Sequence, residues 1–425
     1  MARKEIYAAL EIADHEVRLV VGEMFDSRLN ILRVERAAGG GVEKREINDE
    51  KAVVAAIRKA AADASAALGC RILPEFACRI ERVLLAIPSK RVTRVNQKVN
   101  VTIDDGTRTV RLFHIQSGYN KAITYRAADD LVLVNAGCIK YKVNGITSRK
   151  LPLGENCESF VMDMDLLYAD KKTVYDYARC VELANLEIMD ICLDSYAMAQ
   201  EAAVFEQAID RYIVQVDLSR SDTVLTLFAH GRLVRCIRVD EGYAHWYEEL
   251  QRRFHLKDSA CFRLLQNLFS ADPQQNGDNV IYIESIDGQQ VQVTAADVFS
   301  CCMERMHAWV RTISETCELI VRGGTTRYVV SGEGMDIQVL GELMKEFNAP
   351  ASAYVPQLIG ARQAAFTTTV GMIYNWKEIQ QIRKDGRISV NHNEMEESVE
   401  SINKVAHDGE GGFTRKLRSI LLSDR

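Results

Sequence analysis

The chain has 425 residues, of which 47% are hydrophobic and 26% charged, and this composition is typical of globular proteins. Its length predicts one to three domains. The net charge of −6 argues against nucleic acid as the main partner, because no basic block could release phosphate counterions over a long site. The 11 cysteines are scattered without a CxxC pair, which predicts reduced thiols in a cytoplasmic protein. No apolar run approaches the ~20 residues of a membrane span, so any membrane contact should be peripheral.

Two segments far apart in the chain have the same pattern. Residues 7–34 begin with an apolar strand that carries Glu11 near its end, followed by a polar turn and two further strands. Residues 212–239 repeat this order with Asp217 in the place of the acid. Alternation and β-branched residues support strands throughout. Two such meanders are best explained by a duplicated domain.

The elements around the two meanders predict a mixed sheet with helices on both faces, occurring twice. The expected helices cover residues 49–68, 171–184, 195–205, 243–254, 296–318 and 338–347, and the expected strands cover 79–87, 187–193 and 327–330. This is the α/β pattern of duplicated, actin-like lobes of the RNase H type. In such a pair the two turns that carry the acids face each other across a cleft.

The chain divides into six segments. We assign 1–87 with 167–205 to the first lobe and 206–239 with 318–376 to the second lobe, and 240–317 to a small subdomain of the second lobe. An inserted α+β domain covers 88–166, with one helix expected at 112–124 and strands at 130–135, 139–143 and 159–166. The charged stretch 377–411 has few large apolar residues and is predicted to be a flexible linker.

The last segment, 412–425, has the pattern of a short basic amphipathic helix. On a helical projection one face is apolar and the basic groups lie on the far side and the flank; the members are Phe413, Leu417, Ile420 and Leu421, with Arg415, Lys416 and Arg418. At the end of a tether this is the signature of an interfacial anchor on anionic lipid. One copy should bind weakly, whereas several copies in one filament should bind tightly. The alternative is a helix that docks on the protein's own body.

At this point the residues resemble the family of the bacterial cell-division protein FtsA. The matching stretches keep the family's order: 10–12 with 20–23 for the opening strand pair, 80–89 for the entry to the inserted domain (called 1C or SHS2), 139–146 and 152–154 for the hairpin and turn within it, 368–373 for a short closing helix, and the tail. The resemblance implies a membrane-bound filament that recruits FtsZ to the division septum. It also implies that the FtsZ C-terminal peptide binds around residues 240–317, and that other divisome proteins bind the inserted domain.

The chain departs from the family in its three phosphate-binding regions. After Glu11 the first loop has Ala13 and Asp14 where the family has glycine and a hydroxyl residue. The second loop follows Asp217 with Ser219, Arg220, Ser221 and Asp222 instead of glycines, and the third reads Gly332, Glu333, Gly334. Side chains here block the approach of backbone N–H groups to phosphate, and each added acid opposes it by about 1–4 kcal/mol at ~4 Å.

Two features could offset these losses. Magnesium could bridge an acid to phosphate, or Arg220 could contact phosphate directly; otherwise we expect Arg220 to pair with Asp222. We therefore expect ATP with magnesium to bind weakly at most, with no catalytic residues and no resident metal. The eight histidines have no metal-ligand spacing.

Three functions compete on this sequence. The first is an FtsA-like adaptor on the cytoplasmic face of the membrane. The second is a kinase or phosphatase of the same superfold, which the lost glycines oppose. The third is an adaptor for pilus assembly that resembles PilM, which the amphipathic tail opposes.

Overall fold

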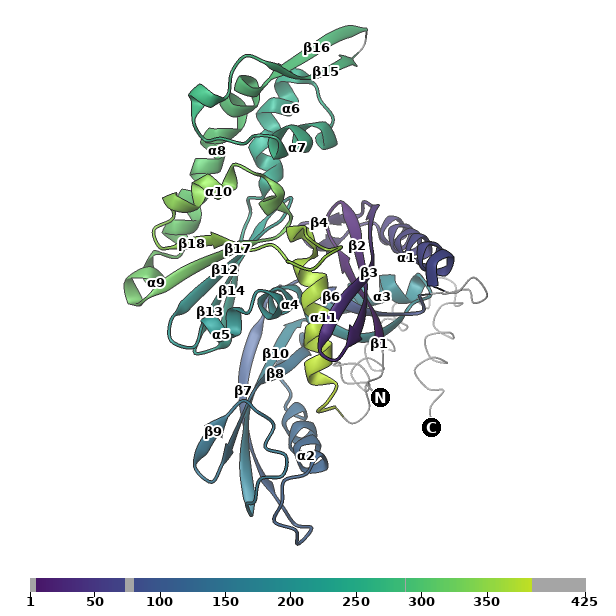
Figure 1. Ribbon diagram of the computed structural model, residues 1–425, viewed down its shortest axis with the longest axis vertical. Helices are drawn as coiled ribbons and strands as arrows, with labels where there is room; N and C mark the ends of the chain where they lie inside the picture. The colour runs from purple at the N-terminus through teal and green to yellow at the C-terminus, as the bar shows by residue number, and fades with distance from the viewer. Residues whose placement is uncertain (1–4, 73–79, 287, 384–425) are drawn as a thin grey trace.

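The computed structural model describes residues 5–72, 80–286 and 288–383. The predicted tail and all of the predicted linker from 384 onward therefore lie outside the described residues. Figure 1 shows two lobes side by side in the middle of an elongated molecule, with a separate sheet at one end and a helical unit at the other. Within the described residues no helix is long and apolar enough to cross a membrane.

The first lobe is a five-stranded sheet in the order β11-β6-β1-β2-β3. Its strands are β1 (Glu5–Ile12), β2 (Glu16–Phe25), β3 (Arg28–Ala38), β6 (Arg82–Ile87) and β11 (Glu187–Leu193). The first three pair antiparallel, while β6 and β11 run parallel to β1. Helices α1 (Glu50–Ile72) and α3 (Lys171–Leu183) pack on this sheet and on each other. The alanine-rich sequence of α1 allows this close approach, since Ala60 and Ala64 are fully buried.

The second lobe repeats this sheet. Its order is β14-β13-β12-β17-β18, which is the same meander followed by two parallel strands. The strands are β12 (Tyr212–Leu218), β13 (Thr223–Ala229), β14 (Arg232–Val239), β17 (Thr326–Ser331) and β18 (Ala351–Ala353). The duplicated unit predicted from the sequence is thus confirmed at the level of strand order and direction.

The segment between β6 and α3 forms a sheet of its own, in the order β7-β10-β8-β9. Its elements are β7 (Thr93–Thr102), α2 (Leu112–Ile123), β8 (Leu131–Val143), β9 (Ile146–Ser148) and β10 (Ser159–Asp170). The two strands expected at 130–135 and 139–143 are one strand, β8, which is irregular at Cys138 (φ +52°) where its register with β10 shifts. Strand β7 escaped prediction because its outward positions are polar or charged.

The helical unit at the other end is built on the second sheet. It contains the 3-10 turn η1 (Tyr243–Tyr247), α6 (Glu248–Phe254), α7 (Asp258–Gln266), β15 (Val280–Ile286), β16 (Gln289–Thr294) and α8 (Ala295–Thr316). Trp246 and Trp309 meet edge to face in its core, with ring centroids 5.3 Å apart. The Thr294 side chain accepts from the Asp297 backbone and Asp297 accepts in return, which fixes the start of α8.

Two expected helices are shorter than predicted. Residues 195–205 form α4 (Asp194–Glu201) and α5 (Val204–Gln207), because Ala203 between them is left-handed (φ +50°). Residues 338–347 hold only α10 (Leu340–Leu343) and a 3-10 turn. Gly323 ends α9 (Glu318–Gly323), and Gly324 lies in the turn that leads to β17.

The last described helix, α11 (Thr367–Ile379), joins the two lobes. It packs against α4 and against β1, β2 and β6 of the first sheet. The approach to α4 is close at Gly371, where a Cβ atom would lie 1.8 Å from the backbone oxygen of Ala197. The chain therefore returns from the second lobe to the first before the described residues end.

Candidate functional site

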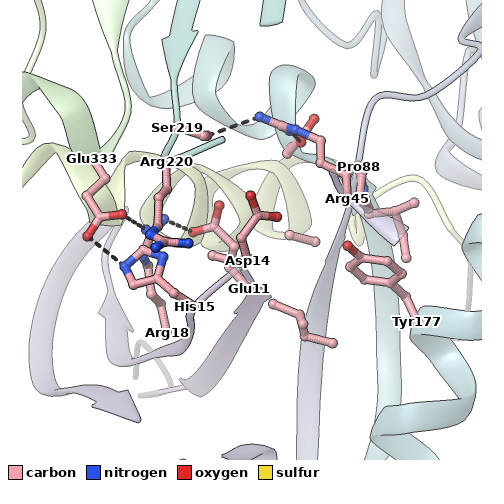
Figure 2. A pocket seen from close by; sticks show the side chains of 15 residues that line it. Glu11, Asp14, His15, Arg18, Arg45, Pro88, Tyr177, Ser219, Arg220 and Glu333 are labelled. Carbon is pink, nitrogen blue, oxygen red and sulfur yellow. Dashed lines mark hydrogen bonds and ion pairs between the residues drawn. The ribbon is translucent and has the colours of Figure 1, made fainter. Parts of the chain in front are cut away.

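The two acid-bearing turns face each other across the cleft, as the sequence predicts. The cavity between them has a volume of about 40 Å³. Figure 2 shows its lining, which comes from both lobes and consists of Glu11, Ile12, Ala13, Asp14, His15, Arg18, Arg45, Ala86, Ile87, Pro88, Tyr177, Asp194, Ser219, Arg220 and Glu333. Pockets that hold small ligands usually measure ≈ 300–1,000 Å³, whereas this one has room for roughly three water molecules.

Arg45 lines this cavity from the first lobe. It lies in the two-residue turn between β4 (Val42–Glu43) and β5 (Glu46–Ile47), and both turn residues are left-handed, Lys44 at φ +51° and Arg45 at φ +64°. Such a turn favours asparagine and glycine, so two side chains here carry backbone strain. The Arg238 guanidinium of the second lobe donates to the Lys44 carbonyl at 3.0 Å.

The Arg45 guanidinium bonds three carboxylates and a hydroxyl. The partners are Asp194 at 2.5 Å, Asp217 at 2.9 Å, Asp222 at 3.0 Å and the Ser219 hydroxyl at 3.1 Å. Asp194 begins α4, whereas the other three belong to the second lobe. Burial alone would lower the pKa of Arg45, but the three carboxylates raise that pKa well above its ordinary value. Arg45 is therefore charged and ties the first lobe to the second.

A second ionic cluster surrounds Glu333, which follows β17. Arg18 of β2 and Arg36 of β3 donate to its two oxygens at 2.8 and 2.5 Å. His15 lies 3.3 Å from the same carboxylate, and the Tyr243 hydroxyl donates to it at 2.8 Å. Burial would raise the pKa of Glu333, but Arg18, His15 and Arg36 together hold it well below its usual range. Glu333 is therefore an ionised, buried group that reaches from the second lobe to the first.

The remaining loop residues also have partners within the protein. The Ser221 hydroxyl donates to the Asp14 carboxylate across the cleft. Arg220 pairs with Asp258 at 2.7 Å, so the expected pair with Asp222 is not formed and Asp222 binds Arg45 instead. The physical reason is reach: Asp222 is fully buried beside the Arg45 turn, while the Arg220 side chain extends toward α7.

The two glycines of the third phosphate-binding region, Gly332 and Gly334, allow the chain to pack closely against β12. Gly332 is left-handed (φ +90°), and a Cβ atom there would lie 2.4 Å from the Asp217 carboxylate. At Gly334 a Cβ atom would lie 2.3 Å from the Leu218 side chain. Both glycines are thus needed where β17 ends against β12.

The electrostatics of the cavity oppose a polyphosphate. Burial raises the pKa of Glu11 to about 7 although Arg18 lies near it, and burial also raises the pKa of Asp217 in spite of Arg45. These shifts mean that the surroundings of both acids disfavour negative charge. An ATP molecule would face these acids and Asp14, and its phosphates would compete for Arg45 with three carboxylates. Together with the volume and the lost glycines, this means that the residues present do not fit ATP with magnesium in this conformation.

One group of side chains has the composition of a metal site. His15, Glu16 and Glu333 bring possible ligand atoms within 4.8 Å of one another. Glu16 is, however, paired with Arg18 at 2.5 Å and with Arg36 at 2.8 Å, and Glu333 is paired with the same two arginines. Two guanidinium groups already balance the two carboxylates, so we assign no metal here.

Sequence reasoning identified most acids of the cleft and Arg220, but it missed the other bases and Asp194. The structure brings Glu11, Ala13, Asp14, Ser219, Arg220 and Glu333 to one cavity and places Asp217, Ser221 and Asp222 against it. Arg18, Arg36, Arg45, His15 and Asp194 were not anticipated. The only local signal was the charged pair Lys44-Arg45 between Glu43 and Glu46, which lacks the asparagine and glycine that mark a tight hairpin.

In sequence, the chain is similar to a group of curated bacterial proteins. No family model matches the chain. Among curated proteins it is 23% identical over 384 residues to the cell division protein FtsA of Bacillus subtilis (strain 168), covering 88% of this chain and 84% of that protein. It is 21% identical over 422 residues to FtsA of Enterococcus hirae, covering 96% and 93%.

Solved structures agree in fold. A PilM-PilN type IV pilus biogenesis complex matches with a TM-score of 0.55 and 12% identity, covering 87% of this chain and 98% of that chain. The ethanolamine utilization protein EutJ of Carboxydothermus hydrogenoformans matches with a TM-score of 0.50 and 10% identity, covering 87% and 89%. The chain thus has the actin-like fold and is a homologue, over most of its length, of curated proteins named cell division protein FtsA.

Proposed function

We propose that this protein is a cell-division adaptor of the FtsA type, which polymerises on the inner face of the cytoplasmic membrane and tethers FtsZ filaments at the septum. The observation that carries the proposal is the match to curated FtsA proteins over 88–96% of the chain. The filled cleft supports a structural role over phosphoryl transfer. We therefore expect weak ATPase activity or none.

The proposal assigns a separate task to each of three segments of the chain. The tail, 412–425, attaches to anionic lipid through the apolar face of Phe413, Leu417, Ile420 and Leu421 and the basic groups Arg415, Lys416 and Arg418. The helical unit from 240 to 317 receives the FtsZ C-terminal peptide. The separate sheet within 88–166 contacts other divisome proteins, and copies of the chain contact one another in a filament.

Two measurements on the full chain test this function. The first is co-sedimentation with FtsZ, with FtsZ lacking its C-terminal peptide as the control; equal recovery of both would contradict the assignment. The second is flotation with liposomes that contain anionic lipid. We expect Leu417→Glu, on the apolar face, to abolish flotation, and the matched Ser419→Glu, on the opposite face, to retain most of it. Flotation of a chain that lacks 413–425 at the full level would show that the tail is no anchor.

A pilus-assembly adaptor remains the second candidate, because the PilM-PilN complex shares the fold over 98% of its matched chain. Binding to the cytoplasmic segment of a pilus membrane protein, without binding to FtsZ, would favour it.

A further inference from the structure

Most of the polar residues that replace the phosphate-binding glycines form a bond from one lobe to the other, whereas Arg220 pairs with Asp258 within the second lobe. Asp14 of the first loop bonds Ser221 of the second, Asp222 bonds Arg45, and Glu333 of the third region bonds Arg18 and Arg36. Residues that had merely lost a ligand would be expected to point into solvent. Here Asp222 is 0% exposed and Glu333 is 2% exposed, while Asp14 and Ser221 are partly buried.

The cost of placing these charges inside the protein makes their pairing a strong constraint. A buried carboxylate or guanidinium without a partner is very unfavourable, and removing one member of a buried pair is far more damaging than the pair is favourable. The partners lie on opposite lobes, so separating the lobes would break the bonds of Arg45 to Asp217 and Asp222. It would also break those of Glu333 to Arg18 and Arg36, and water would have to replace all of these bonds. The closed arrangement of the lobes is therefore the one in which every member of the two clusters is paired.

We propose that the lobes are held closed by the protein's own ionic clusters, with Arg45 as the positioning residue that occupies the cleft in place of a nucleotide and its cation. The inference rests on the actin-like fold and on the contacts of the cleft, and it stands whether or not the protein binds FtsZ. Its consequence is that closure, and any assembly that depends on closure, is independent of ATP.

The hairpin that carries Arg45 has a strained turn, which contacts with the second lobe hold in place. Its turn adopts left-handed backbone at two consecutive side-chain-bearing residues, and such strain persists only where the surroundings enforce it. The surroundings here are the second-lobe contacts, namely the bond from Arg238 to the Lys44 carbonyl and the bonds from Arg45 to Asp217 and Asp222. A surface hairpin without a function would favour asparagine or glycine at these positions.

Hydrogen exchange of the full-length protein tests the proposal. We expect amides of the loop 219–222 and of the turn 13–15 to exchange at the same rate with and without 5 mM ATP and magnesium, a concentration set at about the cellular level so that micromolar binding would saturate. In Arg45→Ala we expect these amides to exchange roughly tenfold faster or more, because exchange follows the local opening equilibrium. Arg45→Lys, which keeps the charge but not the fork of donors, should lie between the two.

The matched control is Lys90→Ala. Lys90 follows β6 and pairs with Glu46 on the solvent side of the hairpin, so this variant removes one cation that contacts the hairpin outside the cleft. Protection by ATP in the wild type, or exchange in Arg45→Ala no faster than in Lys90→Ala, would overturn the proposal. If Arg45→Ala does not fold, Arg45→Lys carries the test alone, and exchange equal to the wild type would then count against it.

Discussion

Arg232 connects the separate sheet to the second lobe, and replacing it is expected to be costly. It lies on β14, and its guanidinium bonds two acids of β10, Asp165 at 2.6 Å and Asp163 at 2.8 Å. Its side chain is 10% exposed, and those of Asp165 and Asp163 are 3% and 26% exposed. The pair with Asp165 is therefore buried, while the pair with Asp163 is partly screened by solvent.

The expected loss of stability depends on the partners that Asp165 would keep in Arg232→Ala. Breaking a fully buried pair costs about 3–5 kcal/mol, because the other charge is left without compensation. Asp165 would retain Arg94 at 3.0 Å and the Asn96 amide at 3.1 Å, so its charge would stay partly paired in Arg232→Ala. We therefore expect a loss of about 2–4 kcal/mol in the free energy of unfolding, below the full figure.

Urea unfolding followed by circular dichroism measures this loss, and hydrogen exchange of β10 locates it. Arg82→Ala is the control, because its pair with Glu187 is more than half exposed and such pairs contribute at most about 1 kcal/mol. A double-mutant cycle with Asp163→Asn should show coupling of about 0.5–3 kcal/mol. A cost for Arg232→Ala no larger than that of the control, with β10 exchange unchanged, would refute the view that this sheet is fixed to the second lobe.

Three further outcomes are expected. Burial raises the pKa of Glu11 to about 7, so the folded protein binds a proton there that the unfolded chain releases near 4.5; stability from this group is complete below pH ~4.5 and is lost as the pH rises to 7. Glu11→Gln should flatten that fall, by at most about 1.4 kcal/mol per pH unit, and identical melting profiles of variant and wild type between pH 5 and 7.5 would contradict it. Lys44→Asn should stabilise the protein by up to about 1 kcal/mol, because asparagine tolerates the left-handed turn, and a loss on thermal melting would show that the turn is unstrained. Gly371→Val should destabilise it by about 3 kcal/mol or more, since no space exists beside the Ala197 carbonyl, and Gly341→Val, at a glycine whose Cβ would meet nothing within 4 Å, is the control for the same melting measurement.

The parts of the fold that the sequence predicts are those with local signals. Both meanders, α1, α2, α3, α8, β11 and β17 carry period and boundary signals within their own residues, and the structure places them within a few residues of the predicted ranges. Strand β7 and the hairpin β15–β16 carry polar or exposed residues on one face, so periodicity alone could not separate them from loops. The break between α4 and α5 depends on the left-handed Ala203, a residue type that gives no warning of it.

In the cleft, too, some features could be predicted from the sequence and others could not. A lost glycine is visible at its own position, so the weakened phosphate loops could be predicted from Asp14, Ser219 and Glu333 alone. The groups that replace the phosphate contacts could not be predicted, because Arg45 lies more than 170 positions away in the chain from Asp217 and Asp222. Such a pairing follows from the duplicated fold, which brings the two acidic loops together and leaves buried carboxylates that require a cation. The need for a positive charge in this cleft could thus be inferred from the acids, while its source, a strained turn between two very short strands, depends on the tertiary structure.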